Sequence, residues 1–236
     1  MSEQKPASGK ASPQDRGDAT REKLLNAAID VFGRRGFDGA STRALATAAG
    51  VNLQAIPYYF GSKQGLYIAA AEHIASRIAA HVGEHRDRAR AQLQHGEDGK
   101  RVLSPDQVRP LLTQMVETMA MLLTSRESEP WARFLIREQM EPTEAFRRVY
   151  SSFMQPTLEV ASQLVGILLN EDPKSEHVRL RTLSFVGGIM VFRMAHAAAL
   201  AHLGWTEIGP EQKETVRNLA RELVTTLRPS ERRHET

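Results

Sequence analysis

Residues 41–67 read STRALATAAGVNLQAIPYYFGSKQGLY, and this stretch decides the fold of the N-terminal part of the chain. Thr42 is expected to cap a short helix, and Gly50 ends that helix because a left-handed backbone is cheapest at glycine. Asn52 then caps a second short helix over 53–60. Two short helices joined by such a sharp turn predict a helix-turn-helix unit.

The second short helix has an inward and an outward face. Ile56 and Phe60 are four residues apart and therefore share the inward face. On the outward face, a glutamine can pair with an adenine edge, and an alanine or leucine can touch a thymine methyl group. Tyrosine hydroxyls, and the lysine that starts the next helix, suit phosphate oxygens. The candidate DNA-binding residues are Thr42, Arg43, Asn52, Leu53, Gln54, Ala55, Pro57, Tyr58, Tyr59 and Lys63.

Pro57 is the unusual residue of this unit, because it would be the fifth residue of the helix 53–60. Proline has no N–H, so the carbonyl of Leu53 would lose its usual partner. We expect the first turn of this helix to be splayed and its angle in a DNA groove to be changed.

The positive charge of the chain is concentrated around this unit. The formal net charge of the whole chain is +3, and residues 20–64 alone hold six Lys or Arg against three Asp or Glu. The rest of the chain therefore balances. A basic excess placed on a helix-turn-helix favours a polyanionic partner there.

Length and composition limit the number of domains and the kinds of site that the chain can form. A chain of 236 residues is expected to form one or two domains with a real core. Cysteine is absent from the sequence, which excludes disulfides and thiolate metal sites and favours a reducing compartment, here the cytoplasm. Residues 1–19 are polar and lack the apolar segment of a secretory signal. We expect them, and the tail 229–236, to be disordered.

Helical periodicity dominates, and the sequence contains no convincing alternating strand pattern. We therefore predict an all-α protein of about nine helices. A three-helix helix-turn-helix domain should occupy residues 20–66. A C-terminal helical bundle for ligand binding and dimerisation should occupy residues 67–228.

The ends of the longer helices follow from glycines and polar stretches. The first helix is expected from Thr20 to Arg35, with Gly36 as its stop. A long helix should begin at Lys63 and end before a polar loop at 95–104.

Prolines and a serine cap mark the later helices. Pro156 lies inside an apolar helical run and should kink it. Ser175 is expected to start one long helix that reaches Leu203. The prolines expected to open helices are Pro105, Pro130, Pro142 and Pro210.

The last two long helices carry apolar stripes that suit packing against a second copy of the chain. Their residues recur at steps of three and four and include small side chains, which favours close antiparallel packing in a four-helix arrangement. The candidate interface residues are Leu183, Gly187, Met190, Met194, Ala197, Ala201, Val216, Leu219, Leu223 and Leu227. The alternative is that these stripes form the core of a monomer.

Residues 183–203 also have the length of a membrane span. Arg193, His196 and His202 lie within them, and each is costly in lipid. We therefore interpret the stretch as a packed helix of a soluble protein and expect no membrane partner.

A ligand pocket is expected among the middle helices, where methionine and aromatic residues cluster and could line an adaptable apolar site. Arg137, Glu138, Gln139 or Arg193 could anchor a polar group of the ligand. The candidate ligand-binding residues are Met119, Trp131, Phe134, Arg137, Met140, Phe146, Phe153, Phe192 and Arg193. Plain core packing is the alternative for each of them.

A metal-binding or hydrolytic alternative rests on His81, Glu84 and His85, which have the H-x-x-E-H spacing of a zinc-protease motif. Such a site needs two histidine ligands, a glutamate base and a distant acidic ligand. This helix is rich in alanine and arginine, so we interpret the spacing as a solvated helix face. No catalytic residue, metal or cofactor is expected.

The helix-turn-helix resembles the N-terminal domain of TetR-family transcriptional regulators. The matching residues are Thr42, Leu45, Ala46, Ala49, Gly50, Val51, Asn52, Tyr58, Phe60, Ser62, Lys63 and Leu66. Two positions depart from the family pattern, because Pro57 and Tyr59 stand where tyrosine and histidine are frequent.

Three segments narrow the resemblance to the CecR-like branch of that family. They are AIPYYFGSKQGLY, FLIREQMEPTEAF at 134–146 and FRMAHAAALAHLGW at 192–205. The resemblance implies a homodimer that binds a palindromic double-stranded DNA operator. It also implies a repressor that a small-molecule effector releases, which makes the chain a regulator and not an enzyme. A helical interaction module without DNA binding is a third possibility, and it predicts no salt-dependent affinity for duplex DNA.

Overall fold

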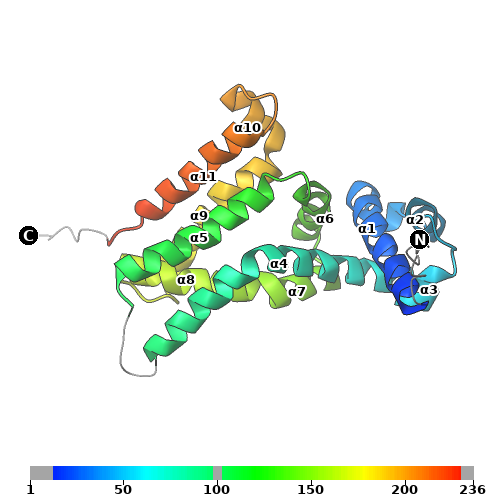
Figure 1. Ribbon diagram of the computed structural model, residues 1–236, viewed down its shortest axis with the longest axis horizontal. Helices are drawn as coiled ribbons and strands as arrows, with labels where there is room; N and C mark the ends of the chain where they lie inside the picture. Colours follow the sequence, from blue (N-terminus) through cyan, green and yellow to red (C-terminus); the bar gives the residue numbers. More distant parts are fainter. Residues whose placement is uncertain (1–12, 98–102, 230–236) are drawn as a thin grey trace, which may run out of the picture. The chain divides into compact units, whose positions relative to one another are not determined.

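The computed structural model describes residues 13–97 and 103–229. Within these ranges the chain forms α-helices and one π-helical turn, without a β-strand (Figure 1). The all-α prediction is therefore confirmed, with more helical segments than the nine expected. Most of the predicted N-terminal arm, part of the loop 95–104 and nearly all of the predicted tail lie outside the described residues.

The chain divides into two compact units, residues 1–70 and 71–236, here called the N-terminal and C-terminal units. Helix α1 (Pro13–Gly39) begins the N-terminal unit and starts earlier than the predicted Thr20. Proline is well tolerated in a first helical turn because the N–H that it lacks would have no partner there. The predicted stop at Gly36 is a kink inside α1, where φ is 72° and ψ is 179° and after which a short helical segment continues to Gly39.

Three further helices follow: α2 (Thr42–Ala49), α3 (Ala55–Phe60) and α4 (Lys63–Glu97). The cap of α2 is Ser41, whose Oγ accepts a hydrogen bond of 3.1 Å from the Ala44 N–H. Thr42 is therefore the first helical residue, and its prediction as the cap was wrong. Helix α4 also takes in residues 95–97 of the predicted loop.

The core of the N-terminal unit includes an apolar stripe on α1. Its members, Leu24, Leu25, Ala28, Ile29 and Phe32, are at most 2% exposed. Helix α1 packs against α2, and α2 packs against α3. This packing fixes which face of the short helix α3 remains open.

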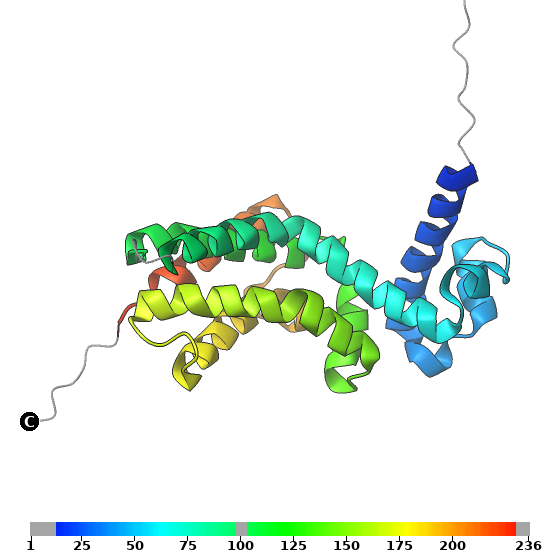
Figure 2. The same ribbon diagram turned by 90° about the horizontal axis from the view of Figure 1, so that it is seen from below.

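The C-terminal unit holds most of α4 and seven later helices. These are α5 (Pro105–Leu123), α6 (Ser128–Met140), α7 (Glu144–Val149), α8 (Gln155–Leu169), α9 (Glu176–Met194), α10 (His196–Leu203) and α11 (Pro210–Thr225). Helix α5 is central and packs against α8, α9 and α11 (Figures 1 and 2). Its buried residues join those of its neighbours in one apolar cluster, which includes Leu112, Leu164, Val178 and Ala220.

Proline positions agree with most of the predicted helix starts. Pro105 and Pro210 are the first residues of α5 and α11, and Pro130 lies in the first turn of α6. The N–H of Ser104 donates to Gln107 Oε1 over 3.0 Å, which caps the start of α5. Pro142 differs, because it precedes the cap of α7 rather than opening the helix.

Pro156 disturbs its helix in a different way from the expected kink. It is the second residue of α8, and the five residues before α8, Tyr150–Met154, form a π-helical turn. A wider turn of this kind accommodates a local irregularity in a helical run without ending the run. The helix predicted across this region is therefore divided into α7, the π turn and α8.

The long helix predicted from Ser175 to Leu203 is broken at Ala195, where φ is −113° and ψ is 37°. Helices α9 and α10 meet there at 86°. Neither proline nor glycine occurs between 189 and 203, so hydrophobic periodicity alone could not locate the break. Residues on both sides of it, including Phe192 and Ala199, pack against the core.

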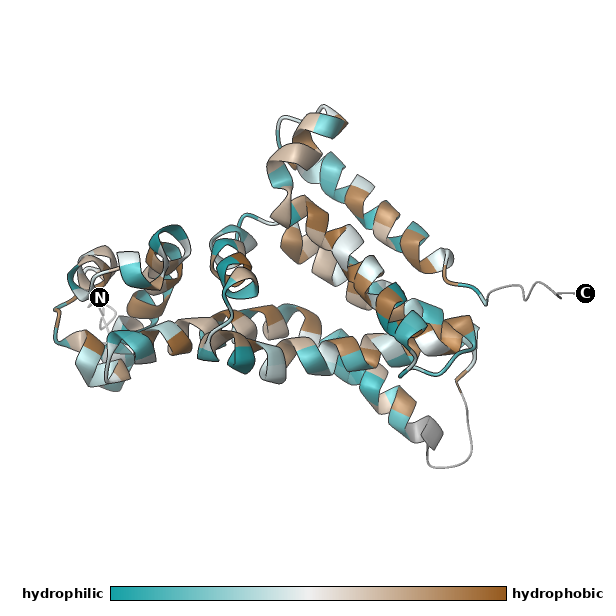
Figure 3. Ribbon diagram, turned by 180° about the vertical axis from the view of Figure 1, so that it is seen from behind, coloured by the Kyte–Doolittle hydropathy of each residue, from teal (hydrophilic) through white to brown (hydrophobic). Residues whose placement is uncertain are grey.

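Hydrophobic residues continue along α9 and α10, as the colouring in Figure 3 shows. Among the residues that the structure describes, no single helix is both long and apolar enough to cross a membrane. Only α9 and α10 taken together reach the required length, and the bend separates them.

Candidate nucleic-acid interface

The turn between α2 and α3 begins at the predicted glycine. Gly50 adopts the left-handed conformation with φ 64°. The Val51 N–H then donates to the Ala46 carbonyl over 3.0 Å. Asn52 does not cap α3 as predicted, because the cap position is Gln54 and has no side-chain cap hydrogen bond. Asn52 Oδ1 instead accepts a hydrogen bond of 2.9 Å from the Gln54 N–H in the turn before α3. These bonds fix the direction in which α3 leaves the turn.

Pro57 is accommodated by a tight turn instead of a splayed one. Helix α3 begins at Ala55 and not at Leu53, so Pro57 is its third residue. The Leu53 carbonyl, expected to lose its partner, accepts from the Ile56 N–H over 3.3 Å. This is a bond to the residue three positions earlier, typical of the tighter 3₁₀ geometry. The regular helix therefore starts two residues later than predicted.

The exposure of α3 separates an inward anchor from an outward face. Ile56 is 1% exposed, whereas Tyr58 is 80% exposed. Tyr59 is only half-buried and meets Tyr58 edge to face, with ring centres 4.8 Å apart. A Cβ atom on Gly17 would lie 3.5 Å from Tyr59 Oη, so Tyr59 leans against α1. Tyr58 is thus the freer of the two tyrosines for an external contact.

An open hollow of about 540 Å³ lies on this face of the N-terminal unit. Its lining residues are Thr20, Val51, Asn52, Gln54, Ala55, Pro57, Tyr58 and Tyr59. Six of them belong to the predicted DNA-binding set. Sequence reasoning missed the other two, Thr20 and Val51. Thr20 was expected to start α1 and not to lie within a longer helix.

The other four predicted residues lie outside the lining of the hollow. Arg43 is exposed on α2, beside the half-buried Thr42. Leu53 is 40% exposed in the turn before α3. Lys63 is half-buried at the start of α4.

The corner between α3 and α4 depends on two glycines. Gly61 has a φ of 74°. Ser62 Oγ accepts a hydrogen bond of 3.0 Å from the Gly65 N–H and caps the first turn of α4. A Cβ atom on Gly65 would lie 2.0 Å from the Phe60 carbonyl oxygen. Only glycine therefore allows α4 to start this close to the end of α3.

The predicted ligand-binding residues do not form one set in the C-terminal unit. Arg137 and Met140 are exposed, Met140 by 79%, so they do not line an enclosed site. Phe146 is half-buried and stacks on Tyr150 with ring centres 5.7 Å apart. Met119 is also half-buried. The buried members are Trp131, Phe134, Phe153 and Phe192.

Arg193 is a helix cap and not a free polar anchor. Its guanidinium donates to the Leu123 carbonyl over 2.7 Å and also to the Ser125 carbonyl. These groups lie at the C-terminal end of α5, where a cation is favourable. Partial burial lowers the pKa of Arg193.

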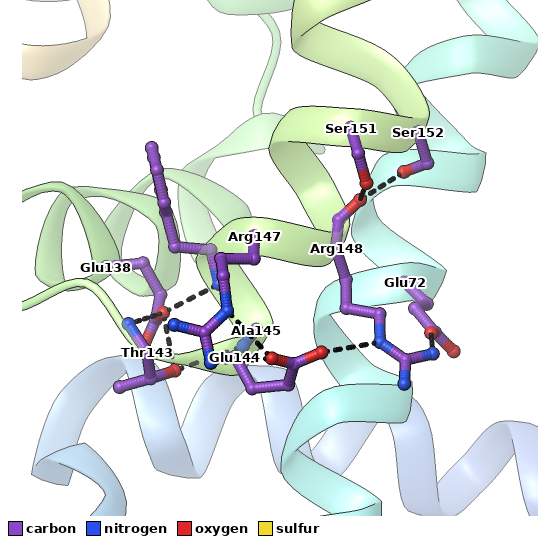
Figure 4. A network of polar contacts seen from close by, with 10 residues as sticks. Glu72, Glu138, Thr143, Glu144, Ala145, Arg147, Arg148, Ser151 and Ser152 are labelled. Atoms are coloured by element: carbon purple, nitrogen blue, oxygen red, sulfur yellow. Dashed lines mark hydrogen bonds and ion pairs between the residues drawn. The ribbon is translucent and has the colours of Figure 1, made fainter.

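Glu138 caps the start of α7 from inside the unit (Figure 4). It is 2% exposed. Its Oε2 accepts from the Thr143 N–H over 3.2 Å, the Thr143 hydroxyl over 2.8 Å and the Phe146 N–H over 2.9 Å. A carboxylate satisfied by three donors at a helix N-terminus is structural, so it is no longer a candidate ligand anchor.

A second polar group in Figure 4 joins α7 to α4. Arg148 donates to Glu72 Oε1 over 3.0 Å and to Glu144 Oε1 over 3.1 Å. The hydrogen bonds from Arg147 and Arg148 lower the pKa of Glu144. Because these side chains are largely exposed, the bridge is expected to contribute little to stability.

Two of the H-x-x-E-H residues, His81 and Glu84, make contacts within the C-terminal unit, whereas the buried Nδ1 of His85 has no hydrogen-bond partner among the described residues. His81 Nε2 lies 3.5 Å from Glu127 Oε2, and its ring centre is 6.4 Å from that of Trp131. Glu84 pairs with Arg88 over 2.8 Å. Across the described residues there is no group of three or more potential ligands that could hold a metal ion.

The predicted interface residues divide into an exposed and a buried group. Leu183 and Met194 on α9 are 54% and 45% exposed. Gly187 on α9 and Ala197 and Ala201 on α10 are also exposed.

The remaining interface candidates are less accessible. Met190, Leu219 and Leu223 are partly buried. Val216 and Leu227 are at most 2% exposed and belong to the core of their own chain. The prediction that these two residues face a second copy was therefore wrong. An apolar stripe on a helix has the same sequence pattern whether its own chain or a second copy covers it, so the sequence alone could not distinguish the two cases.

Two family models match the chain, one for each part. Residues 24–70 match the family described as bacterial regulatory proteins, tetR family. Residues 108–228 match the C-terminal domain of the HTH-type transcriptional dual regulator CecR.

Individual relatives match either most of the chain or a short part of it. The chain is 30% identical to the HTH-type transcriptional dual regulator CecR of Shigella flexneri over 201 residues, which cover 85% of this chain and 87% of that protein. It is 46% identical to the HTH-type transcriptional repressor NicS of Pseudomonas putida over 57 residues, or 24% of this chain and 27% of that protein.

Solved structures agree on the fold. A transcriptional regulator from Pseudomonas aeruginosa PAO1 superposes with a TM-score of 0.62 at 18% identity, covering 92% of each chain. AibR, solved with isovaleryl coenzyme A and operator DNA, gives a TM-score of 0.61 at 14% identity, covering 89% of this chain and 98% of AibR.

Proposed function

The chain belongs to the TetR family of bacterial regulatory proteins, in the branch defined by the CecR C-terminal domain, and we propose that it is a cytoplasmic, homodimeric transcriptional repressor. It binds a palindromic DNA operator through the α2–α3 unit. A small molecule bound in the C-terminal unit lowers its operator affinity.

The outward face of α3 is the observation that carries this proposal. The buried Ile56 anchors the helix, while Gln54 and Tyr58 are exposed and line the hollow. Helices that enter the major groove read bases with residues near their N-termini, and dimers place two such helices about one helical turn of DNA apart. A short exposed reading helix with polar residues at its start suits this task.

Selection of bound duplexes from a random DNA pool tests the function directly. We expect a palindromic site, and the affinity for it should fall steeply as salt rises. A chain that retains no duplex at low salt would contradict DNA binding.

Gln54→Ala is expected to weaken binding to the selected site by about 1–3 kcal/mol and to relax the preference at particular base pairs. Gln54 is exposed at the start of α3, where its amide can pair with an adenine edge. Titration against a panel of single-base variants measures both effects. Gln92→Ala, an exposed position in the C-terminal unit, is the matched control. If Gln54→Ala leaves the site preference unchanged, the proposed orientation of α3 is wrong.

The homodimer is supported by an exposed apolar face on α9. Thr182 and Ile189 face the core. The opposite side of the helix bears Leu180, Leu183, Ser184, Gly187, Val191 and Met194, all exposed. A Cβ atom on Gly187 would meet nothing within 4 Å, so another helix could approach closely there. A contiguous apolar surface of this kind is typical of a protein–protein interface.

Leu183→Glu is expected to weaken the dimer by about 100-fold or more, since a carboxylate buried at the centre of an apolar interface costs several kcal/mol. Sedimentation equilibrium measures the change, and operator affinity should fall with it. Arg90→Glu places the same charge at an exposed position of α4 and should leave the dimer intact. A wild-type chain that sediments as a monomer at micromolar concentration would exclude this interface.

Effector binding is supported by the buried aromatic residues of the C-terminal unit and by its structural relatives. Trp131, Phe134 and Phe153 provide an apolar environment between the helices. AibR was solved with isovaleryl coenzyme A, and a FadR from Bacillus subtilis, at a TM-score of 0.51, with stearoyl-CoA. Screening compounds for release of the chain from its selected operator would identify the effector.

A further inference from the structure

Three aromatic rings form a compact cluster in the N-terminal unit. The Tyr67 ring lies edge-on to Phe32 at 4.8 Å and to Phe37 at 5.2 Å, measured between ring centres. Phe32 and Phe37 stack at 6.1 Å. Phe32 and Tyr67 are at most 5% exposed, whereas Phe37 is half-buried. The cluster therefore holds Phe37 firmly while part of that residue reaches the surface.

The position of Phe37 is set by the kink in α1 at Gly36. Gly36 has a φ of 72°, which side chains other than glycine rarely adopt. The chain changes direction at this residue, and Phe37 follows it immediately. Its place is thus determined by backbone geometry as well as by ring packing.

The Lys63 ammonium lies over the Phe37 ring, with Nζ 4.3 Å from the ring centre. A cation over an aromatic face is attracted by the negative potential of that face. Within the described residues, Lys63 forms no ion pair with a carboxylate, in contrast to Arg34, which is paired with Asp30 at 2.8 Å. The charge of Lys63 is therefore oriented by the ring without being neutralised.

Holding the side chain in one orientation before a ligand binds matters particularly for lysine. Its long stem has many rotamers, and fixing them when a ligand binds reduces the affinity. An ammonium has three N–H donors, so contact with a ring on one side leaves donors for a phosphate on the other. A ring that holds the stem beforehand lowers the entropy lost on binding.

We propose that Phe37 is a positioning residue for DNA binding, because its ring holds the Lys63 ammonium ready to meet a phosphate of the DNA backbone. This inference rests on the proposed function. It adds to the interface a residue that lies outside the two short helices α2 and α3 and acts through Lys63.

A double-mutant cycle tests the coupling. The wild type, Phe37→Leu, Lys63→Ala and the double variant are titrated with the selected operator duplex at several salt concentrations. Phe37→Leu is expected to weaken binding about two- to fivefold, the range of an exposed cation–π contact, and to keep the salt slope because the charge remains. Lys63→Ala should reduce the salt slope by about one. The double variant should bind no more weakly than Lys63→Ala alone.

Conservative replacements of Phe37 distinguish an effect on the orientation of Lys63 from an effect on folding. Phe37→Tyr and Phe37→Trp keep an aromatic face and should retain wild-type affinity. Without DNA, the NMR signals of the Lys63 ε-methylene protons should show an upfield ring-current shift that Phe37→Leu removes.

Two results would overturn the inference. One is a Phe37→Leu effect of equal size in the Lys63→Ala background, which would mean that Phe37 acts only through the core. The other is a Lys63 methylene signal without a ring-current shift. Neither result affects the proposed function, which fails separately if the wild type shows no salt-dependent affinity for duplex DNA.

Discussion

Gly65→Ala is expected to abolish specific DNA binding and to destabilise the N-terminal unit by about 1–3 kcal/mol or more. The added methyl carbon would lie 2.0 Å from the Phe60 carbonyl oxygen and 3.2 Å from its carbon. Both atoms are backbone, so neither can move aside by a change of rotamer. Relief requires α3 and α4 to separate, and α3 is the helix proposed to read DNA.

Gly83→Ala provides the matched control for this substitution, because it makes the same chemical change in the same helix. A Cβ atom there would meet only the end of the Arg86 side chain, at 3.8 Å. Alanine in a helix interior is favoured over glycine by roughly 0.5–1 kcal/mol, so this variant should be slightly more stable. Thermal unfolding and operator titration of both variants measure the contrast. Wild-type binding by Gly65→Ala would show that the corner tolerates displacement.

Glu138→Ala is expected to lower the free energy of unfolding by about 3 kcal/mol or more. A buried carboxylate with three donors makes charge-assisted hydrogen bonds, each worth about 1.5–3 kcal/mol. Its removal also leaves the N–H groups of Thr143 and Phe146 without the partner shown in Figure 4. Urea denaturation measures the loss, and amide hydrogen exchange should show α7 opening first.

Two further variants make the Glu138 result specific. Glu141→Ala removes a carboxylate from an exposed position three residues away and should change stability by no more than about 0.5 kcal/mol. Glu138→Gln keeps the size and one acceptor oxygen, and its effect should be intermediate. A Glu138→Ala protein as stable as Glu141→Ala would show that α7 does not depend on this cap.

The helix-turn-helix could be predicted from the sequence because its signals are local. Gly50 and Asn52 act on their own turn, and the alternation of Ile56 with outward residues needs only the helical repeat. Three predictions about this unit were wrong in detail, namely the residue that caps α2, the residue that caps α3 and the effect of Pro57. Ser41 and Thr42 are both competent caps, and only the backbone decides between them. The effect of Pro57 depends on the residue at which α3 begins, and helix propensity predicts the ends of helices poorly.

The C-terminal unit was less predictable because its decisive contacts join distant residues. Arg193 caps α5 across 70 positions of sequence, and no periodicity marks such a bond. The break at Ala195 has no proline or glycine to mark it in the sequence, and residues on both sides of it pack against the core. Val216 and Leu183 lie on similar stripes, and only the three-dimensional arrangement shows that one is buried and the other exposed.

The placement of Trp131 gives the C-terminal unit a built-in optical label. The sequence has two tryptophans, Trp131 and Trp205, and both belong to this unit. Arg77 of α4 lies over the Trp131 ring, with its Cζ 5.8 Å from the ring centre, beside His81. Indole emission responds to nearby charge, so a change of α4 against α6 should alter the fluorescence of the native chain. Compounds could therefore be screened by emission alone, before any operator sequence is known.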